Sequence, residues 1–154
     1  MDIANYRLDL KTNQVFKLRG SEQKLSARLS PDGRYISAGR YISAARQQIL
    51  MLYDFNIETW SELGRGNYGS NNWSHDSKFV YVRNVIGDDR GTESQQVELV
   101  RIRVSDHKVE RVLSLNDVTP PGWAGWVSLD SDDSPIPLRD RSTQEIYRLD
   151  LQFR

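Results

Sequence analysis

One pentapeptide occurs twice in this chain, near its two ends. Tyr-Arg-Leu-Asp-Leu stands at 6–10 and again at 147–151. Between these copies, Tyr53-Asp54-Phe55 and Val100-Arg101-Ile102 continue an even spacing, because positions 7, 54, 101 and 148 are each 47 residues apart. A repeat of about 45 residues is typical of stacked supersecondary units, each of which buries its apolar face only against a neighbour. The repeat therefore limits the fold to such stacked architectures.

Each unit contains a short turn that is rich in Ser, Asp and Gly. The turns are Ser30-Pro31-Asp32-Gly33, then 74–77 and 130–133. Proline presets φ at the second position, Asp and Ser cap nearby amides, and Gly accepts a left-handed exit. The third turn has neither the proline nor the glycine, so its turn type stays open. An apolar residue precedes each turn: Leu29, Trp73 and Leu129.

Runs rich in Tyr, Ile, Val and Phe surround these turns and predict β-strands. No apolar periodicity of 3.6 residues is long enough to predict a helix. The sequence therefore predicts an all-β fold in which each unit has four short antiparallel strands. After the strand that precedes the turn, we expect second strands at 34–38, 78–82 and 136–139, third strands at 49–55, 97–104 and 145–151, and fourth strands at 14–18, 59–63 and 108–113.

A four-stranded antiparallel unit of this length, with a large apolar residue before its first hairpin, is typical of a β-propeller blade. The segments 29–36 and 73–80, together with the strand at 146–150, resemble the TolB-like propeller repeat over nearly the whole chain. The resemblance implies propeller blades without specifying a chemistry. It also implies that such repeats can be joined to DNA-binding, kinase or peptidase domains.

The strand count predicts a single partial propeller domain over residues 1–154. The chain starts with a third and a fourth strand, passes through two complete units, and finishes with a first, second and third strand, which makes about three blades. Closed propellers typically have four to eight. We expect a second chain to complete a six-bladed ring as a homodimer. The alternative is the C-terminal part of a longer propeller. One feature points to this alternative: the two identical end strands would compete for one position in the dimer.

Two segments are longer than a bare blade needs. Gly-Arg-Tyr-Ile-Ser-Ala occurs twice in succession, at 33–38 and 39–44. Since six is even, either copy would present the same side chains to the same sheet face. We expect one copy in a loop, or a lengthened hairpin that uses both. The polar segment 84–96 predicts a mobile surface loop.

Charge and composition exclude several classes of partner. The 154 residues include 21 basic and 21 acidic side chains, so no global field attracts nucleic acid or an anionic membrane. No apolar run approaches the roughly 20 residues of a membrane-spanning helix. The chain has no cysteine, which excludes disulfides, thiolate catalysis and cysteine-bound zinc. The compartment stays open.

The residue types that carry chemistry fall mainly in turns. His75 and His107 are expected to be solvated turn residues, and Asp32, Asp76 and Asp132 to shape their turns. The acidic segment 130–133 lacks the spacing of a calcium loop, and no nucleophile, zinc or phosphate-loop motif occurs. We therefore expect no enzyme activity, no catalytic residue, no metal site and no cofactor. Trp73 is expected in the core, and Arg101 and Arg103 on a solvated face.

Four residues form a binding hypothesis. Trp123 and Trp126 follow Pro120-Pro121-Gly122 in the longest connection from a fourth strand to the next first strand. Propellers commonly build the rim of their channel from these connections, and aromatic side chains there suit a ligand. Asn67 and Tyr68 occupy the equivalent connection one blade earlier.

Two functions are consistent with these features. The favoured one is a non-catalytic propeller scaffold or binding module, with a protein or small-ligand partner at the channel face. The alternative is a hydrolase or lyase in the central channel, built from carboxylates and arginines of several blades.

Overall fold

The structure, a computed structural model, describes residues 3–42, 47–87, 96–118 and 126–137. Within these ranges the chain forms twelve β-strands, β1 to β12, and no helix. Accordingly, the described part of the chain contains no helix long and apolar enough to cross a membrane. The predicted all-β fold is confirmed.

Two complete four-stranded antiparallel sheets form the body of the molecule. In each sheet the strands lie side by side in chain order, so each sheet is a meander. This arrangement confirms the predicted four-stranded unit. The first sheet contains β3 (Lys24–Leu29), β4 (Tyr35–Ile42), β5 (Gln47–Asp54) and β6 (Thr59–Gly66), and the second contains β7 (Tyr68–Trp73), β8 (Phe79–Ile86), β9 (Gln96–Arg103) and β10 (Val109–Ser114).

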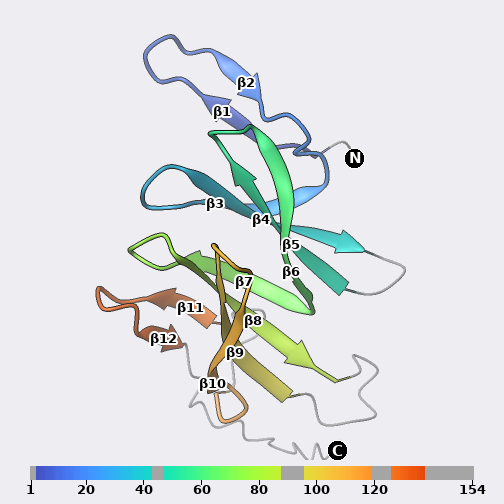
Figure 1. Ribbon diagram of the computed structural model, residues 1–154, viewed down its shortest axis with the longest axis vertical. Helices are drawn as coiled ribbons and strands as arrows, with labels where there is room; N and C mark the ends of the chain where they lie inside the picture. The colour runs from blue at the N-terminus through green and yellow to red at the C-terminus, as the bar shows by residue number, and fades with distance from the viewer. Residues whose placement is uncertain (1–2, 43–46, 88–95, 119–125, 138–154) are drawn as a thin grey trace, which may run out of the picture.

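A two-stranded sheet lies at each end of this body (Figure 1). One pairs β1 (Tyr6–Leu8) with β2 (Val15–Lys17), and the other pairs β11 (Trp126–Leu129) with β12 (Pro135–Pro137). In the repeat, β1 and β2 are third and fourth strands, whereas β11 and β12 are first and second strands. The third strand predicted at 145–151 lies outside the described residues.

Equivalent positions in the hairpins between third and fourth strands are not evenly spaced along the chain. The backbone N–H of Asp9 donates to Gln14 at 2.9 Å, and that of Arg103 donates to Lys108 at 3.0 Å. Asp54 pairs with Thr59 at the same point of its own hairpin. The structural steps are therefore 45 residues (9 to 54) and 49 residues (54 to 103). Their mean is the predicted 47, but the even marker positions 7, 54 and 101 are not equivalent.

The duplicated hexapeptide lengthens a hairpin. The ladder between β4 and β5 runs without interruption from Tyr35 opposite Asp54 to Ile42 opposite Gln47, and therefore includes residues of both copies. The β8–β9 hairpin is also longer than predicted, since Ile86 pairs with Gln96 within the predicted loop. Of that loop, residues 88–95 lie outside the described residues.

The main core lies between the two complete sheets. Polar side chains also join the sheets there. The amide nitrogen of buried Asn71 donates to the Ser26 carbonyl at 3.2 Å, and its oxygen accepts from the Ser37 hydroxyl at 2.8 Å. The apolar members of the core are Leu50, Leu52, Leu63, Tyr68, Trp73, Val80, Val82, Val100 and Ile102.

Trp73 fills the core as predicted. Its indole N–H donates to the Arg28 carbonyl at 2.9 Å, and its ring stacks on Tyr35 with centroids 6.1 Å apart. Trp73 is 8% exposed, whereas Leu29, at the same point of the preceding unit, is 60% exposed. The difference arises because Trp73 faces a sheet with all four strands, while Leu29 faces β1 and β2, beside which no first or second strand lies in the described part of the chain.

Replacing Trp73 tests whether contacts between sheets hold the body together. We expect Trp73→Ala to lower the free energy of unfolding by about 3–5 kcal/mol, because it leaves a cavity and an unpaired carbonyl. The matched control is Ile57→Ala, whose side chain is 67% exposed and whose loss should change stability by less than ~0.5 kcal/mol. Urea denaturation followed by circular dichroism measures both. Equal effects would contradict this account of the core.

Candidate functional site

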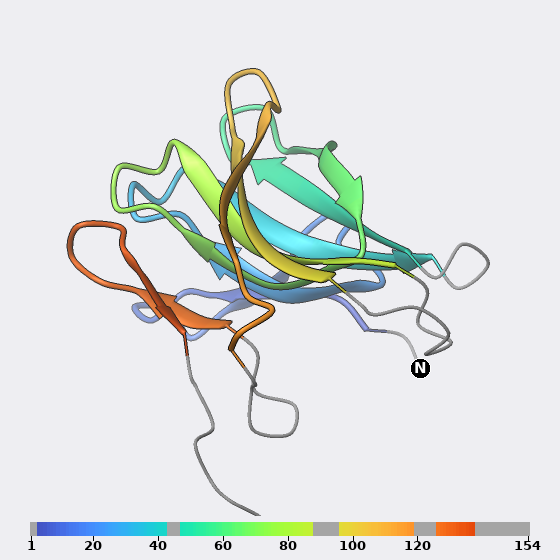
Figure 2. The same cartoon turned by 90° about the horizontal axis from the view of Figure 1, so that it is seen from below.

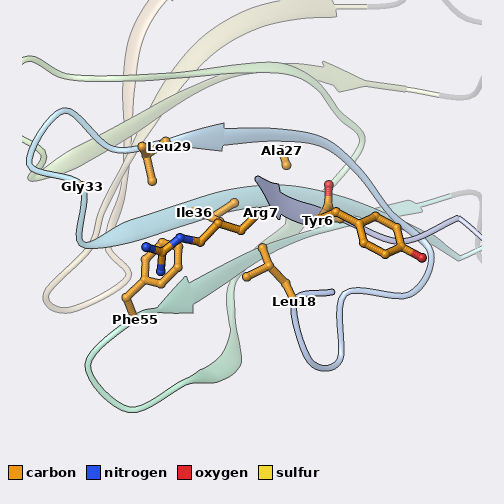
Figure 3. A pocket seen from close by; sticks show the side chains of 9 residues that line it. Tyr6, Arg7, Leu18, Ala27, Leu29, Gly33, Ile36 and Phe55 are labelled. Carbon is orange, nitrogen blue, oxygen red and sulfur yellow. The ribbon is translucent and has the colours of Figure 1, made fainter. Parts of the chain in front are cut away.

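A groove of about 590 Å³ opens between β1 and β3 (Figure 3). Its walls come from the N-terminal hairpin, from the first strand of the complete sheet beside it, and from the ends of neighbouring strands. Most of the lining side chains are apolar. They are Asn5, Tyr6, Arg7, Leu18, Ala27, Leu29, Gly33, Ile36 and Phe55.

The floor of the groove is a small core of its own. Buried Leu18, Ile36 and Tyr53 pack together there, with Phe55 and Trp60 against them. Along one wall, Ala27 and Leu29 point the same way because side chains two apart on a strand share a face. The groove is therefore a fixed apolar surface rather than a gap between loops.

One side of the groove is also an open strand edge. The N–H of Asp9 bonds to the Gln14 carbonyl, and the N–H of Leu18 bonds to the Asn5 carbonyl, both at 2.9 Å. Because hydrogen-bonded and non-bonded pairs alternate in an antiparallel ladder, the N–H and C=O of Tyr6 and Leu8 point away from β2. In the described part of the chain, no strand lies on that side of β1.

Arg7 adds a positive charge to this apolar surface. Its side chain extends along the groove toward the end where Gly33 and Phe55 lie (Figure 3). Within the residues that the structure describes, Arg7 forms no ion pair. An acidic group brought to this end would therefore find a guanidinium group that forms no contact ion pair with a described carboxylate.

The structure places only part of the binding hypothesis derived from the sequence. Asn67 is the single residue between β6 and β7, and Tyr68 is the first residue of β7. Tyr68 is buried in the core, and this burial raises the pKa of its hydroxyl. Trp126 begins β11, but its side chain and all of Trp123 lie outside the described residues. Binding at these connections stays a prediction.

Asp32 and Asp76 shape their turns as predicted. Each carboxylate accepts hydrogen bonds from the serine two residues before it and from the backbone N–H two residues after it. The bond from the Ser30 hydroxyl, with further bonds from Arg34 and Ser77, holds the pKa of Asp32 below its usual value. These two carboxylates stabilise turns, which accounts for their recurrence in the sequence.

Asp132 was predicted to shape the third turn, but the carboxylate that accepts the hydrogen bonds of this turn is that of Asp130. Asp130 accepts the N–H groups of Asp132 and Ser134 at 2.9 and 2.8 Å. The turn is also one residue shorter, since Leu129 pairs with Pro135 whereas Leu29 pairs with Ile36. The left-handed position is kept in all three turns: Gly33 (φ 73°), Ser77 (φ 62°) and Asp133 (φ 59°).

Successive turns bond to one another. The Asp32 N–H donates to the Ser77 hydroxyl at 3.1 Å, and the His75 N–H donates to the Asp133 carboxylate at 2.9 Å. The His75 ring nitrogen Nδ1 also lies 2.7 Å from that carboxylate. His75 is thus a bridge between sheets rather than a solvated turn residue alone, whereas exposed His107 is the left-handed residue of a hairpin turn. The His75 contact joins two turns that are 58 residues apart, so no local sequence signal would have found it.

The remaining charges pair along the outer strands. Glu110 accepts hydrogen bonds from Arg101 and Arg103, and both guanidinium groups lie over the Phe79 ring, at 4.4 and 5.6 Å from its centroid. Within the described ranges, no three His, Asp or Glu side chains gather as metal ligands would. The apolar groove is therefore the best candidate site.

Comparison with known proteins supports the fold. No family model and no curated protein matches the sequence. TolB from Acinetobacter baumannii is similar in structure, with a TM-score of 0.60 and 15% identity over 90% of this chain and 33% of that one. The β-propeller domain of the Trilobed protease from Pyrococcus furiosus matches with a TM-score of 0.59 and 14% identity over 80% of this chain and 36% of that one.

A peptidase chain is also similar. The acylaminoacyl peptidase from Pyrococcus horikoshii matches with a TM-score of 0.53 and 14% identity over 70% of this chain and 22% of that one. The present chain thus spans between 22% and 36% of the length of these three proteins. At such identities the likeness shows the fold alone. The two complete sheets are β-propeller blades, as the sequence predicts.

The depressed pKa of Asp32 predicts a pH dependence of stability. A carboxyl whose pKa is lower in the folded state stabilises the protein above its unfolded pKa, which is about 4, and this stabilisation disappears as the pH falls through the folded pKa. Asp32→Asn should therefore be less stable than the parent protein at pH 7, and the difference should shrink at pH values near 2.

The control is Asp117→Asn. Asp117 is exposed and accepts no hydrogen bond within the described ranges, so its loss should have a small effect on stability. Urea denaturation at several pH values measures both variants. A stability difference for Asp32→Asn that stays constant from neutral to acidic pH would show that the carboxylate charge does not stabilise the turn.

Proposed function

We propose that this chain is a non-catalytic propeller module of the TolB-like type that binds an extended polypeptide segment in the groove beside β1. The observation that carries the proposal is the meeting of exposed Leu29 with the open edge of β1 in one groove. A strand edge supplies main-chain hydrogen bonds to a partner strand, and an adjoining apolar pocket supplies specificity for alternate side chains.

The lining of the groove defines the chemistry of the segment. Apolar side chains at every second position would cover Ala27, Leu29 and Ile36, and the backbone would pair with Tyr6 and Leu8 of β1. An acidic residue near one end would pair with Arg7. The segment is therefore short and extended, with alternating apolar residues and a carboxylate.

The comparisons support a propeller module, and the TolB structure covers most of this chain. The alternative, a hydrolase or lyase in the central channel, needs catalytic groups that converge in a sheltered place. In the described part of the chain, the one histidine that bonds to a carboxylate is His75, with a side chain that is 59% exposed at a turn between sheets. A pair in that position supports a link between blades.

A library of random linear peptides displayed on phage tests the binding role. The chain is immobilised at low density so that copies do not meet, and the retained peptides are sequenced. We expect enrichment of alternating apolar peptides that carry an acidic residue. Leu29→Lys should lose these clones, because it places a charge in the apolar groove.

The matched control is Ile57→Lys, which adds the same charge at an exposed aliphatic side chain outside the groove. It should retain the clones. The binding proposal fails if the parent protein enriches no peptide family, or if Leu29→Lys and Ile57→Lys retain the same clones.

A further inference from the structure

We propose that the segment which fills the groove is the β11–β12 hairpin of a second copy of this chain. This inference rests on the proposed binding role of the groove and names its partner. The groove lies where the first and second strands of a blade would stand beside β1 and β2. The β11–β12 hairpin consists of a first and a second strand. The two half-blades are therefore complementary.

A chain's own hairpin does not reach its own groove. In the described residues β12 pairs only with β11 and β1 only with β2. β1 and β2 lie at the top of Figure 1, whereas β11 and β12 lie beside the second complete blade (Figures 1 and 2). Two copies satisfy both half-blades at once, because each copy contributes a hairpin and a groove. Two complete blades and one shared blade per copy then close a six-bladed ring, within the usual range of four to eight.

The complete blades predict how the shared blade would be paired. In the first complete blade, Ser37 of β4 lies opposite Leu52 of β5. The equivalent residues are Ile136 of β12 and Arg7 of β1, after allowance for the shorter third turn. The same register sets Pro135 opposite Leu8 and Pro137 opposite Tyr6.

Side-chain sizes at this interface are matched. Ser37 faces the next blade and bonds to Asn71, so Ile136 would face the equivalent of Asn71, which is Ala27. The position that the polar pair Ser37–Asn71 occupies between the complete blades would be occupied in the shared blade by a large and a small apolar side chain, Ile136 and Ala27. Ile136 is exposed in the single chain, and Ala27 lines the groove. Their contact would remove exposed apolar surface from both copies.

The charges also match. Successive turns abut in this structure, as the Asp32–Ser77 and His75–Asp133 contacts show. The acidic turn at 130–133 would therefore lie beside Gly33 of the second copy. Arg7 extends toward that end of the groove, and neither Arg7 nor Asp132 has an ion-pair partner in the described part of the chain.

The sequence of β1 fits this slot as well. Residues 147–151, which follow β12 in the chain, have the same sequence as 6–10. A second copy's β1 would therefore offer β12 the same side chains as the third strand predicted at 145–151, with which it would compete for this position. Because proline has no N–H, β12 would only accept hydrogen bonds at these positions. The N–H groups of Tyr6 and Leu8 would donate to the carbonyls of Pro137 and Pro135.

Light scattering after gel filtration tests the proposal on the full chain. We expect a mass near twice 17.8 kDa. Leu8→Pro should raise the dimer dissociation constant roughly ten-fold or more, because it removes an N–H at the open edge. Val15→Pro is the matched control: Val15 lies opposite Leu8 in the same hairpin, is 62% exposed against 52%, and points its N–H to the outer edge. This control should remain dimeric.

Mixing two defective variants distinguishes the shared blade from any symmetric contact between identical edges. Leu8→Pro disrupts the groove but leaves the β11–β12 hairpin intact. Ile136→Arg disrupts the β11–β12 hairpin but leaves the groove intact. At a protein concentration where each variant alone is monomeric and the parent protein is dimeric, an equal mixture should form a heterodimer through the one intact hairpin and the one intact groove. A mixture that stays monomeric would overturn the proposal, as would a monomeric parent protein. If the parent is monomeric but its groove still selects peptides, only the identity of the partner is wrong.

Discussion

The structure depends on one requirement, that each blade be covered by the blade before it. A four-stranded antiparallel sheet pairs its own backbone, but the apolar side chains on its faces need a neighbouring sheet. Between the two complete blades this need is met by the stacked rings of Tyr35 and Trp73 and by the hydrogen bonds of buried Asn71. At the N-terminal half-blade, no first or second strand lies beside β1 within the described ranges, and the exposed Leu29 and the apolar groove are found there.

Local chemistry made much of the fold predictable from sequence. The Ser-Pro-Asp-Gly turn, the alternating strands and the repeat length predict four-stranded units because each depends on residues close together in the chain. Features that depend on neighbouring units were missed. The burial of a residue before a turn differs between Trp73 and Leu29, although the sequence pattern is the same, because the covering sheet differs. The contact of His75 with Asp133 joins residues 58 positions apart and has no local signal.

The apolar groove could not be predicted from the sequence. The binding hypothesis at Asn67, Tyr68, Trp123 and Trp126 stays a prediction; of its described residues, Asn67 forms a one-residue connection and Tyr68 packs in the core. The groove lines up residues from β1, β3 and the ends of three other strands, which no motif brings together. The useful signal was the strand count, which identifies β1 and β2 as third and fourth strands. The groove lies beside β1, where the first and second strands of that blade would stand.

The prolines of β12 bear on how such half-blades would recognise one another. A strand edge with free N–H and C=O groups could pair with any extended chain. At the edge of β12, Pro135 and Pro137 have no backbone N–H to donate and present only their carbonyl groups. Backbone pairing alone would then hold the hairpin weakly, so the contact of Ile136 with Ala27 and the charge of Arg7 would have to supply the rest. Selection would therefore rest on side chains that only the correct register brings together.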